Sequence, residues 1–220
     1  MQSNRFVEEL SSLSFENTFN PYSHRCEVYD YVDAPKRRTA TLAAMLDAAC
    51  QVEVDAIWIG RDLGYRGGRR TGLALTDDVH IQAHAARWNV TAQRPTKGGA
   101  VAERTASVIW ALLTRIESPI FLWNVFPLHP HEANDCFSNR SHNARERQAG
   151  EDLLSALVDL LEPKRLIAIG NDAAAAAQRI ADNIPTYKVR HPSYGGQNDF
   201  IAQIGEFYAL DDTQSAGRLL

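Results

Sequence analysis

Two patterns of apolar positions alternate along the chain. Short, mostly apolar runs, typical of buried strands, cover residues 54–59, 119–125 and 165–170, and a final strand is predicted at 185–190. Apolar side chains at helical spacing predict helices at 42–49, 101–116 and 143–161. An alanine-rich stretch predicts a further helix that begins at Asn171 or Asp172, and a last helix is expected after the loop that follows residue 190. Asn143 and Glu146 form a candidate capping box at the start of the third of these helices. Because strands and helices alternate, we expect an α/β fold, a three-layer α/β/α sandwich with a central, mainly parallel four-stranded sheet.

Length and composition predict one domain that spans residues 1–220. The 220 residues, 45% of them hydrophobic, can bury a core without help from disulfides or metal ions. No internal repeat or linker interrupts the chain, although residues 126–143 form a long polar loop of the kind that usually carries function. Neither a membrane-spanning run nor a signal-peptide pattern is present, so we expect a cytoplasmic monomer, associated with the nucleoid in a bacterium.

Basic residues gather locally in a chain whose net charge is −4. A polyanionic partner must therefore bind a local patch and not the whole surface. The run of three basic residues at 36–38 is expected to be solvated surface. The glycine-rich loop at 59–75 carries Arg61, Arg66, Arg69 and Arg70, which repel one another unless an anion lies between them.

Polar residues follow three of the predicted strands. Asp62, Asn124 and His191 each stand at or just after a strand end, and the carboxyl ends of parallel strands share one edge of the sheet. Considered alone, Asp62 could form an ion pair with a nearby arginine, and His191 could be a core histidine that forms a hydrogen bond with the backbone. Asn124 is harder to explain, because a buried amide costs roughly 1–3 kcal/mol for each unsatisfied group. The three together favour a site at this edge.

Three motifs resemble those of the uracil-DNA glycosylase superfamily. They are Gly60-Arg61-Asp62 with the downstream Gly72-Leu73-Ala74, then Leu122-Trp123-Asn124-Val125, and finally His191-Pro192-Ser193. Their order, spacing and structural context agree from about residue 55 to about residue 210. The features are mixed between the uracil-specific branch and the mismatch-specific and thermostable branches.

The resemblance implies a DNA repair enzyme that flips uracil out of DNA and hydrolyses its N-glycosidic bond, leaving an abasic site and free uracil. Asn124 would match O4 and N3–H of uracil, His191 would donate to O2, and Asp62 would hold the attacking water. The matched motifs contain no lysine to form a Schiff base, so the glycosylase is expected to be monofunctional. Hydrolysis needs no cofactor.

The same resemblance implies two further sets of site residues. Around the base we expect Gly60, Arg61, Gly64, Tyr65, Leu75 and Phe126. In contact with DNA we expect Arg66, Arg69, Arg70, Arg140, Ser193, Tyr194, Gly195 and Gln197. The glycines let backbone amides approach the base, and the arginines face the phosphates.

Several positions depart from the family pattern. Gly64 stands where the uracil-specific branch has a tyrosine that excludes a 5-methyl group, although Tyr65 is adjacent. Leu75 replaces the phenylalanine that stacks on the base, and the candidates for stacking elsewhere are Phe19, Tyr22 and Phe126. Gly195 replaces the leucine that wedges into the duplex, and its candidate substitutes are Tyr194 and Gln197. The preferred base therefore stays open among uracil, mismatched thymine and hypoxanthine.

Metal binding is not expected. Residues 139–146 resemble a segment of the thermostable branch, which holds an iron–sulfur cluster through four cysteines, but this chain has three, at positions 26, 50 and 136, and no CxxC pair. They are expected to be free thiols. His129-Pro130-His131-Glu132 is not an HExxH motif, and His80 with His84 lacks a third zinc ligand.

Two other functions stay open. A flavodoxin-like nucleotide-binding domain would also place a glycine-rich loop after a strand, but residues 60–72 contain neither GxGxxG nor GxxxxGK[ST]. A catalytically weak member of the superfamily that binds abasic DNA would keep the fold and the arginines, but it would tolerate loss of Asp62, which is present.

Overall fold

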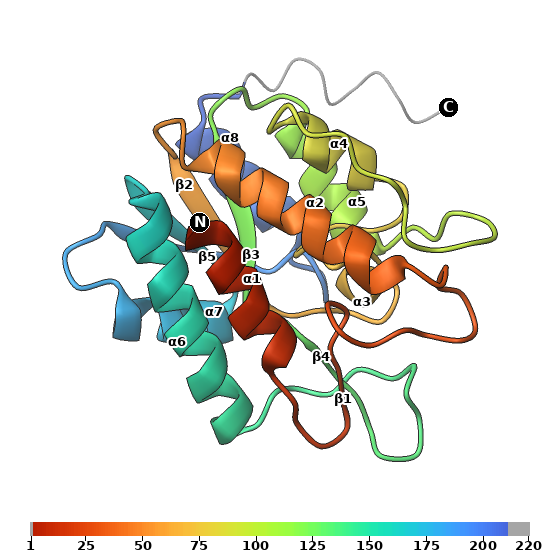
Figure 1. The fold of residues 1–220 in the computed structure, drawn as a ribbon. Coiled ribbons are helices and arrows are strands. Elements are labelled where there is room, and N and C mark those ends of the chain that lie inside the picture. Colours follow the sequence, from red (N-terminus) through yellow and green to blue (C-terminus); the bar gives the residue numbers. More distant parts are fainter. Residues whose placement is uncertain (1, 211–220) are drawn as a thin grey trace.

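The computed structural model describes residues 2–210 and has a four-stranded sheet at its centre (Figure 1). The strands lie in the order β3-β2-β5-β6, with bounds β2 (Ala56–Asp62), β3 (Ile120–Phe126), β5 (Arg165–Ile169) and β6 (Thr186–Val189). Each neighbouring pair is parallel. The four predicted strands and their parallel arrangement are confirmed.

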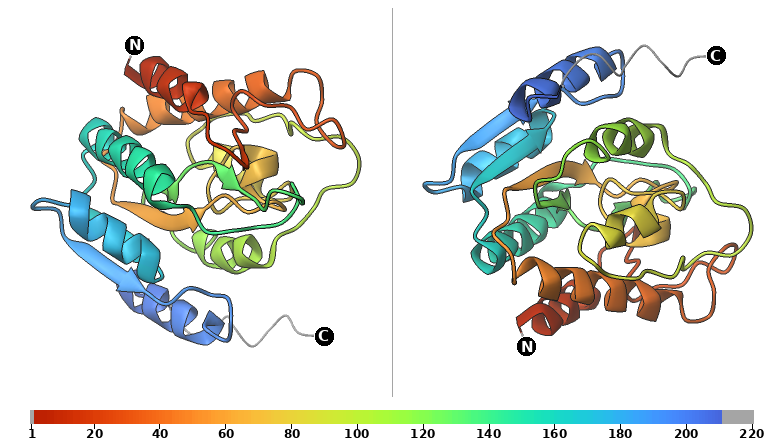
Figure 2. Two further views of the ribbon diagram at one scale, coloured as in Figure 1. Left: turned by 90° about the horizontal axis from the view of Figure 1, so that it is seen from below. Right: turned by 90° about the horizontal axis from the view of Figure 1, so that it is seen from above.

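Helices cover both faces of this sheet (Figure 2). One layer contains α1 (Gln2–Ser12), α2 (Ala34–Ala49), α6 (Ala144–Leu161) and α7 (Asn171–Ile180), and the other contains α5 (Arg104–Leu113) and α8 (Gln197–Phe207). Successive strand residues serve opposite layers, because Ile57 and Ile59 pack in the first core and Trp58 packs in the second. The three-layer α/β/α sandwich is therefore confirmed.

Local signals decide where several helices begin. At α6 the Asn143 side chain accepts from backbone N–H groups and the Glu146 side chain accepts from the Asn143 N–H, so the predicted capping box is present. α7 begins at Asn171, after Gly170 with a φ of 92° that a glycine adopts without strain. α5 begins later than the predicted 101–116 helix, because the backbone N–H groups before it donate to the side chains of Asp77 and Asp78.

The structure also contains elements that the apolar pattern does not predict. They are α1, the short helices α3 (Gly68–Thr71) and α4 (Ile81–Ala86), and a two-stranded antiparallel sheet of β1 (Thr18–Phe19) and β4 (His129–Pro130). β4 lies inside the polar loop 126–143. This loop is therefore tied to the N-terminal part of the chain, next to the carboxyl edge of the main sheet.

Arg38 corrects the expectation that residues 36–38 are solvated surface. Its side chain is fully buried and forms an ion pair with the equally buried Asp30, with Nη2 and Oδ1 2.5 Å apart. Its Nε donates to the backbone oxygen of Arg70 at 2.9 Å. The pair thus joins α2 to the glycine-rich loop, and Arg38 is part of the core of the fold.

Arg69 and Arg70 are also buried, contrary to the expectation that they face phosphate groups. Arg70 donates to the buried carboxylate of Asp78 at 2.7 Å. Arg69 donates to the Tyr29 hydroxyl at 2.8 Å and stacks over the ring of Phe19, 3.9 Å from its centroid. The positive charges of Arg70 and Arg69 are therefore compensated inside the protein, by a carboxylate and by aromatic rings respectively.

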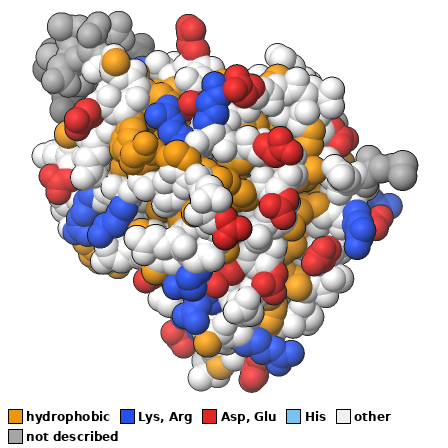
Figure 3. Space-filling model, turned by 90° about the vertical axis from the view of Figure 1, so that its left-hand side faces the viewer, with side chains coloured by type: hydrophobic (Ala, Val, Ile, Leu, Met, Phe, Trp, Pro, Cys, Tyr) orange, Lys and Arg blue, Asp and Glu red, His pale blue; other side chains and the backbone are white. Residues whose placement is uncertain are grey.

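Figure 3 shows one face of the molecule, on which positive and negative side chains are mixed. On that face the Asp and Glu side chains lie among Lys and Arg side chains around a stretch of apolar surface. This face offers no continuous basic patch to a polyanion. None of the helices in residues 2–210 is both long and apolar enough to cross a membrane.

The buried ion pair between α2 and residue 30 is testable by removing one partner. Arg38→Met keeps most of the side-chain volume but leaves the Asp30 carboxylate buried without its cation, so we expect the free energy of unfolding to fall by about 3–5 kcal/mol. The neighbouring Arg37, whose ion pair with Asp33 is partly exposed, is the matched control, and Arg37→Met should cost at most about 1 kcal/mol. Urea denaturation measures both. Equal losses in the two variants would contradict the assigned role of Arg38.

Candidate active site

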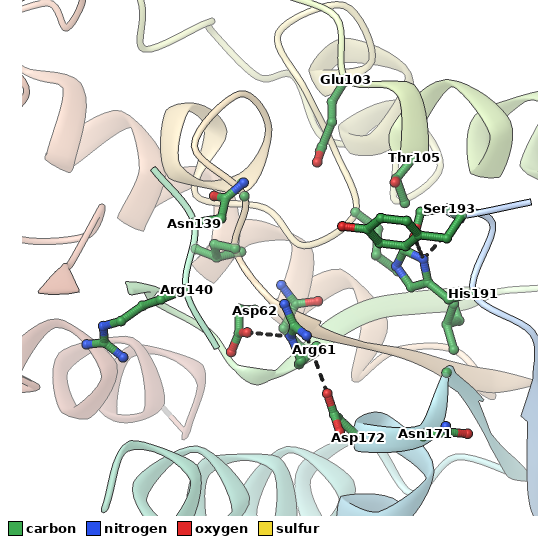
Figure 4. A pocket seen from close by; sticks show the side chains of 18 of the residues that line it. Arg61, Asp62, Glu103, Thr105, Asn139, Arg140, Asn171, Asp172, His191 and Ser193 are labelled. Carbon is green, nitrogen blue, oxygen red and sulfur yellow. Dashed lines mark hydrogen bonds and ion pairs between the residues drawn. The ribbon is translucent and has the colours of Figure 1, made fainter. Parts of the chain in front are cut away.

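A cavity of about 470 Å³ opens at the carboxyl edge of the sheet (Figure 4). Its walls come from the ends of β2 and β3, the start of α5 and the turns that follow β5 and β6. The residues expected from the sequence that line it are Arg61, Asp62, Gly64, Leu75, Asn124, Arg140, His191, Ser193 and Tyr194. The structure thus brings the polar residues of three separate strand ends into one space.

Asp62 is held by two neighbours. Arg61 Nε donates to Oδ2 at 2.7 Å, and His142 Nδ1 donates to Oδ1 at 2.5 Å. The Asp62 side chain is only 7% exposed, so these contacts fix its position at the end of β2. Arg61 also forms an ion pair with Asp172 at 3.4 Å and so lies between the two carboxylates (Figure 4).

Asn124 is a buried amide whose oxygen has no partner. The parallel register places it opposite Gly60 in β2, and an added Cβ on Gly60 would collide with the Asn124 oxygen. Glycine at this position therefore gives the amide its room. Asn124 is 1% exposed and its Oδ1 finds no donor among the described residues, which costs roughly 1–3 kcal/mol. A ligand with an N–H group in the cavity would remove this cost.

His191 presents Nε2–H and not a bare nitrogen. The backbone N–H of Ser193 donates to Nδ1 at 3.1 Å, and the Ser193 hydroxyl lies 2.7 Å from the same atom. Burial, with the charges of Arg61 and Arg190, lowers the pKa of His191 below its usual 6.5, so the ring is neutral at pH 7. Because a backbone N–H can only donate, Nδ1 accepts and the single ring proton is on Nε2.

The predicted stacking residues do not face the cavity. Phe126 is fully buried and packs edge-on against Phe15, and Phe19 lies under Arg69. Tyr22 is buried, and its hydroxyl donates to the Gly72 oxygen. These three rings belong to the core, so this structure gives no stacking role to any of them.

Of the other expected residues, Tyr65 lies outside the cavity wall and Arg140 lies in it. Tyr65 bonds through its hydroxyl to Arg66, which is exposed, so Tyr65 does not restore a block at Gly64. Arg140 lines the cavity, but its charge is paired with Glu146. Gly60 leaves the space that the Asn124 amide occupies. Gly195 lies on the loop directly after Tyr194, and Gln197 is the first residue of α8.

The site contains two groups that the sequence reasoning missed. His142 directly precedes the capping box, which fixes its place at the start of α6, but only the packing of the polar loop against β2 brings it to Asp62. Glu103 precedes α5 and lies in the cavity wall. No local sequence signal marks either contact, because each joins segments that are far apart along the chain.

Glu103 has an unusual carboxyl group. No hydrogen bond or ion pair joins it to another described residue. Burial, with the negative charge of Asp77, raises the pKa of the Glu103 carboxyl from 4.5 to about 7. At neutral pH this group is therefore partly protonated and able to donate as well as accept a hydrogen bond.

The histidines that were considered as zinc ligands bond to protein groups. His129 interacts with Arg69 and the Ser138 oxygen, His80 with Asp77, and His84 with Thr76. Within residues 2–210, no three His, Cys, Asp or Glu side chains are arranged to hold a metal ion.

A parallel α/β sandwich that gathers a carboxylate, an amide and a neutral imidazole at one edge has the features expected of the family that the motifs resemble. The sequence model of the uracil DNA glycosylase superfamily matches residues 49–207, and the chain belongs to this superfamily. It is thus a DNA glycosylase, a hydrolase that acts on N-glycosyl bonds of DNA in repair. The resemblance proposed from the motifs is confirmed.

A solved structure shows the same fold. Wild-type SMUG2 of Pedobacter heparinus is 14% identical and superposes with a TM-score of 0.61, over 95% of this chain and 97% of the other. At this identity the likeness concerns the fold alone. No curated protein sequence matches the chain.

The raised pKa of Glu103 predicts how stability depends on pH. A carboxyl whose pKa is higher in the folded state contributes stability below pH 4.5 and loses it as pH rises towards 7. Glu103→Gln removes this loss, so the variant should match the wild type at pH 4 and exceed its unfolding free energy at pH 8 by on the order of 1–3 kcal/mol. Denaturation at both pH values measures this. Glu117→Gln, at an exposed carboxylate beyond the end of α5, is the control, and an equal gain there would refute the assignment.

Proposed function

We propose that the protein is a monofunctional uracil-DNA glycosylase, which flips uracil into the cavity and releases it, leaving an abasic site. The observation that carries the proposal is the shared cavity of Asp62, Asn124 and His191, in which the Asn124 oxygen lacks a donor and the His191 proton is on Nε2. Since these residues come from segments between positions 60 and 194, we propose that the chain acts as one domain.

Asn124 is suited to select the base. A side-chain amide offers an acceptor and a donor side by side, which match N3–H and O4 of uracil. Cytosine presents a bare N3 and an amino group, so both contacts would be mismatched. The unpaired buried Oδ1 supports this role, because the uracil N3–H would supply the donor that the protein does not.

His191 is suited to stabilise the departing base. When the bond between C1′ and N1 breaks, its electron pair goes to the base and negative charge develops on O2. A neutral imidazole that donates through Nε2–H stabilises this charge without transferring a proton. The Ser193 N–H on Nδ1 maintains the required tautomer, and the resemblance makes the Ser193 hydroxyl a phosphate contact as well.

Asp62 is suited to hold the attacking water. The water oxygen forms the new bond to C1′, its proton passes to the carboxylate, and the carboxylate charge favours the positive character of the sugar in the transition state. Arg61 and His142 each engage one oxygen of Asp62, so they fix the carboxylate while leaving lone pairs for the water. None of the residues that line the cavity is a lysine, which supports hydrolysis without a Schiff base.

The loop after His191 is suited to hold the opened duplex. Tyr194 is 98% exposed at the cavity mouth with a φ of 51°, and Gly195 follows with a φ of 78°. This turn projects the tyrosine ring outward, so Tyr194 is our candidate for the group that fills the space left by the flipped base, with Gln197 behind it. Exposed Arg66 remains a candidate phosphate contact, whereas Arg69 and Arg70 do not, because they are buried.

Two observations favour alternatives within the superfamily. Gly64 has no side chain, which favours a mismatch-type enzyme that also accepts thymine or a purine such as hypoxanthine. The pairing of Asp62 with Arg61 favours a catalytically weak member that binds abasic DNA, because the guanidinium competes with the attacking water for one carboxylate oxygen.

Base release tests the proposal directly. We expect alkali-dependent cleavage of end-labelled DNA that carries uracil opposite guanine, and a rate roughly 10²–10⁴-fold lower for Asp62→Asn, because the variant cannot accept the water proton. Asp159→Asn, an exposed position on α6, is the control and should keep the wild-type rate. The same assay with thymine or hypoxanthine in place of uracil distinguishes the mismatch-type alternative. Binding to abasic DNA without any base release would overturn the proposed activity.

Base selection tests the role of Asn124. Asn124→Asp replaces the amide with a carboxyl that, when protonated, can donate to cytosine N3, so we expect cytosine release relative to uracil release to rise by about tenfold or more. The ratio of kcat/KM on the two substrates measures this. Strict selectivity for uracil in a folded and active variant would remove Asn124 from base recognition.

A further inference from the structure

Glu103 is a cavity group for which the proposed mechanism has no use. It precedes α5, where a glutamate could turn back to cap the helix, yet its side chain makes no capping hydrogen bond. Its backbone is fixed on both sides, because its N–H donates to Asp77 at 2.6 Å and its carbonyl accepts from Ser107 at 2.9 Å. The side chain extends into the cavity instead (Figure 4).

Two glycines make room for the Glu103 carboxyl. An added Cβ on Gly64 would lie 2.9 Å from Oε1, and one on Gly67 would collide with Oε2. The turn that carries them is rigid, since the Gly64 oxygen accepts from the N–H groups of Gly67 and Arg69. The carboxyl therefore occupies the space that a side chain at position 64 would otherwise fill.

We propose that Glu103 is a specificity-determining residue that closes the side of the base pocket left open by Gly64 and so rejects bases with an apolar substituent on C5. The proposal rests on the proposed function, which places the base between Asn124 and His191. The C5 edge then points to the wall at Gly64, where the sequence resemblance implies a blocking tyrosine in other members. Here the obstruction comes from a different element, the segment before α5.

A methyl group at this wall would meet a carboxyl to which no other described residue donates a hydrogen bond. Water that fills the cavity would solvate that carboxyl, and a 5-methyl group would displace this water without replacing its hydrogen bonds. A hydrogen on C5 leaves space for the water. The loss corresponds to about 10- to 100-fold discrimination against thymine.

The protonation state of Glu103 predicts that base release depends on pH, which a purely structural role of this residue would not produce. Asp77, which is bonded to His80, lies beside Glu103, and other charged or titratable residues that line the same cavity are Arg61, Asp62, Arg140, Asp172, Arg190 and His191. Above a pH of about 7 the carboxyl is ionised, and its charge opposes the negative charge that develops on the departing base. Uracil release by the wild type should therefore fall several-fold between pH 6.5 and 8.5.

The test is a series of Glu103 variants assayed on uracil and thymine opposite guanine. Glu103→Ala should raise the ratio of thymine to uracil release at least about tenfold, Glu103→Asp should give an intermediate ratio because its carboxyl is retracted, and Glu103→Gln should keep the rejection of thymine. Glu103→Gln should also remove the fall in rate above pH 7. Glu117→Ala, an exposed glutamate away from the cavity, is the matched control and should behave as the wild type.

The outcomes separate this inference from the proposed function. Uracil release by every folded variant, with thymine rejected throughout the series, overturns the role of Glu103 and leaves the function intact. Thymine release by the wild type at a rate near that of uracil also overturns it. No base release from any substrate by the wild type overturns the proposed function and the inference together. If Glu103→Ala fails to fold, the Asp and Gln variants still decide the question.

Discussion

The parallel pairing of β2, β3, β5 and β6 is the constraint on which the site depends. In a parallel sheet every strand ends at the same edge, so groups at positions 62, 124 and 191 meet although long helical segments separate them in the chain. The register adds a finer condition. Gly60 lies opposite Asn124, and its missing side chain leaves space for an amide that no protein donor satisfies. The sheet therefore fixes the position of the site. Its register also leaves the buried Asn124 oxygen in this site without a donor among the described residues.

The glycine-rich loop shows how a concentration of positive charge is accommodated. Arg70 and Arg38 form buried pairs with Asp78 and Asp30, and Arg69 stacks on aromatic rings. These contacts connect the loop to α2 and to the N-terminal segment, so they hold the floor of the cavity. A buried ion pair contributes little net stability, but leaving one partner without the other is costly, and the arrangement is therefore specific. The sequence suggests a binding patch at Arg69 and Arg70, but in the structure these side chains form contacts inside the protein.

Asymmetry between two carboxyl groups gives the cavity its chemistry. Asp62 is engaged by a cation and a histidine, whereas the Glu103 carboxyl has no hydrogen-bond partner within residues 2–210 and lies near Asp77. Burial and the negative charge of Asp77 raise the pKa of the Glu103 carboxyl, so this group is partly protonated near neutral pH. The same edge of the sheet therefore holds one carboxyl that two partners fix and one whose charge changes near neutral pH. In our proposal the obstruction beside Gly64 comes from another segment of the chain, so specificity would move between elements while the fold is kept.

The layered α/β fold, the four strands, the capping box at Asn143 and the polar residues at the strand ends can all be predicted from the amino-acid sequence. These features follow from local periodicity and from the geometry that all parallel sheets share. The burial of Arg69, the contact of His142 with Asp62 and the position of Glu103 in the cavity become visible only in the folded protein. The physical reason is that these contacts join segments far apart in the chain. A side chain's burial and partners depend on how loops pack across the sheet edge, and no local pattern of apolar and polar positions encodes that packing.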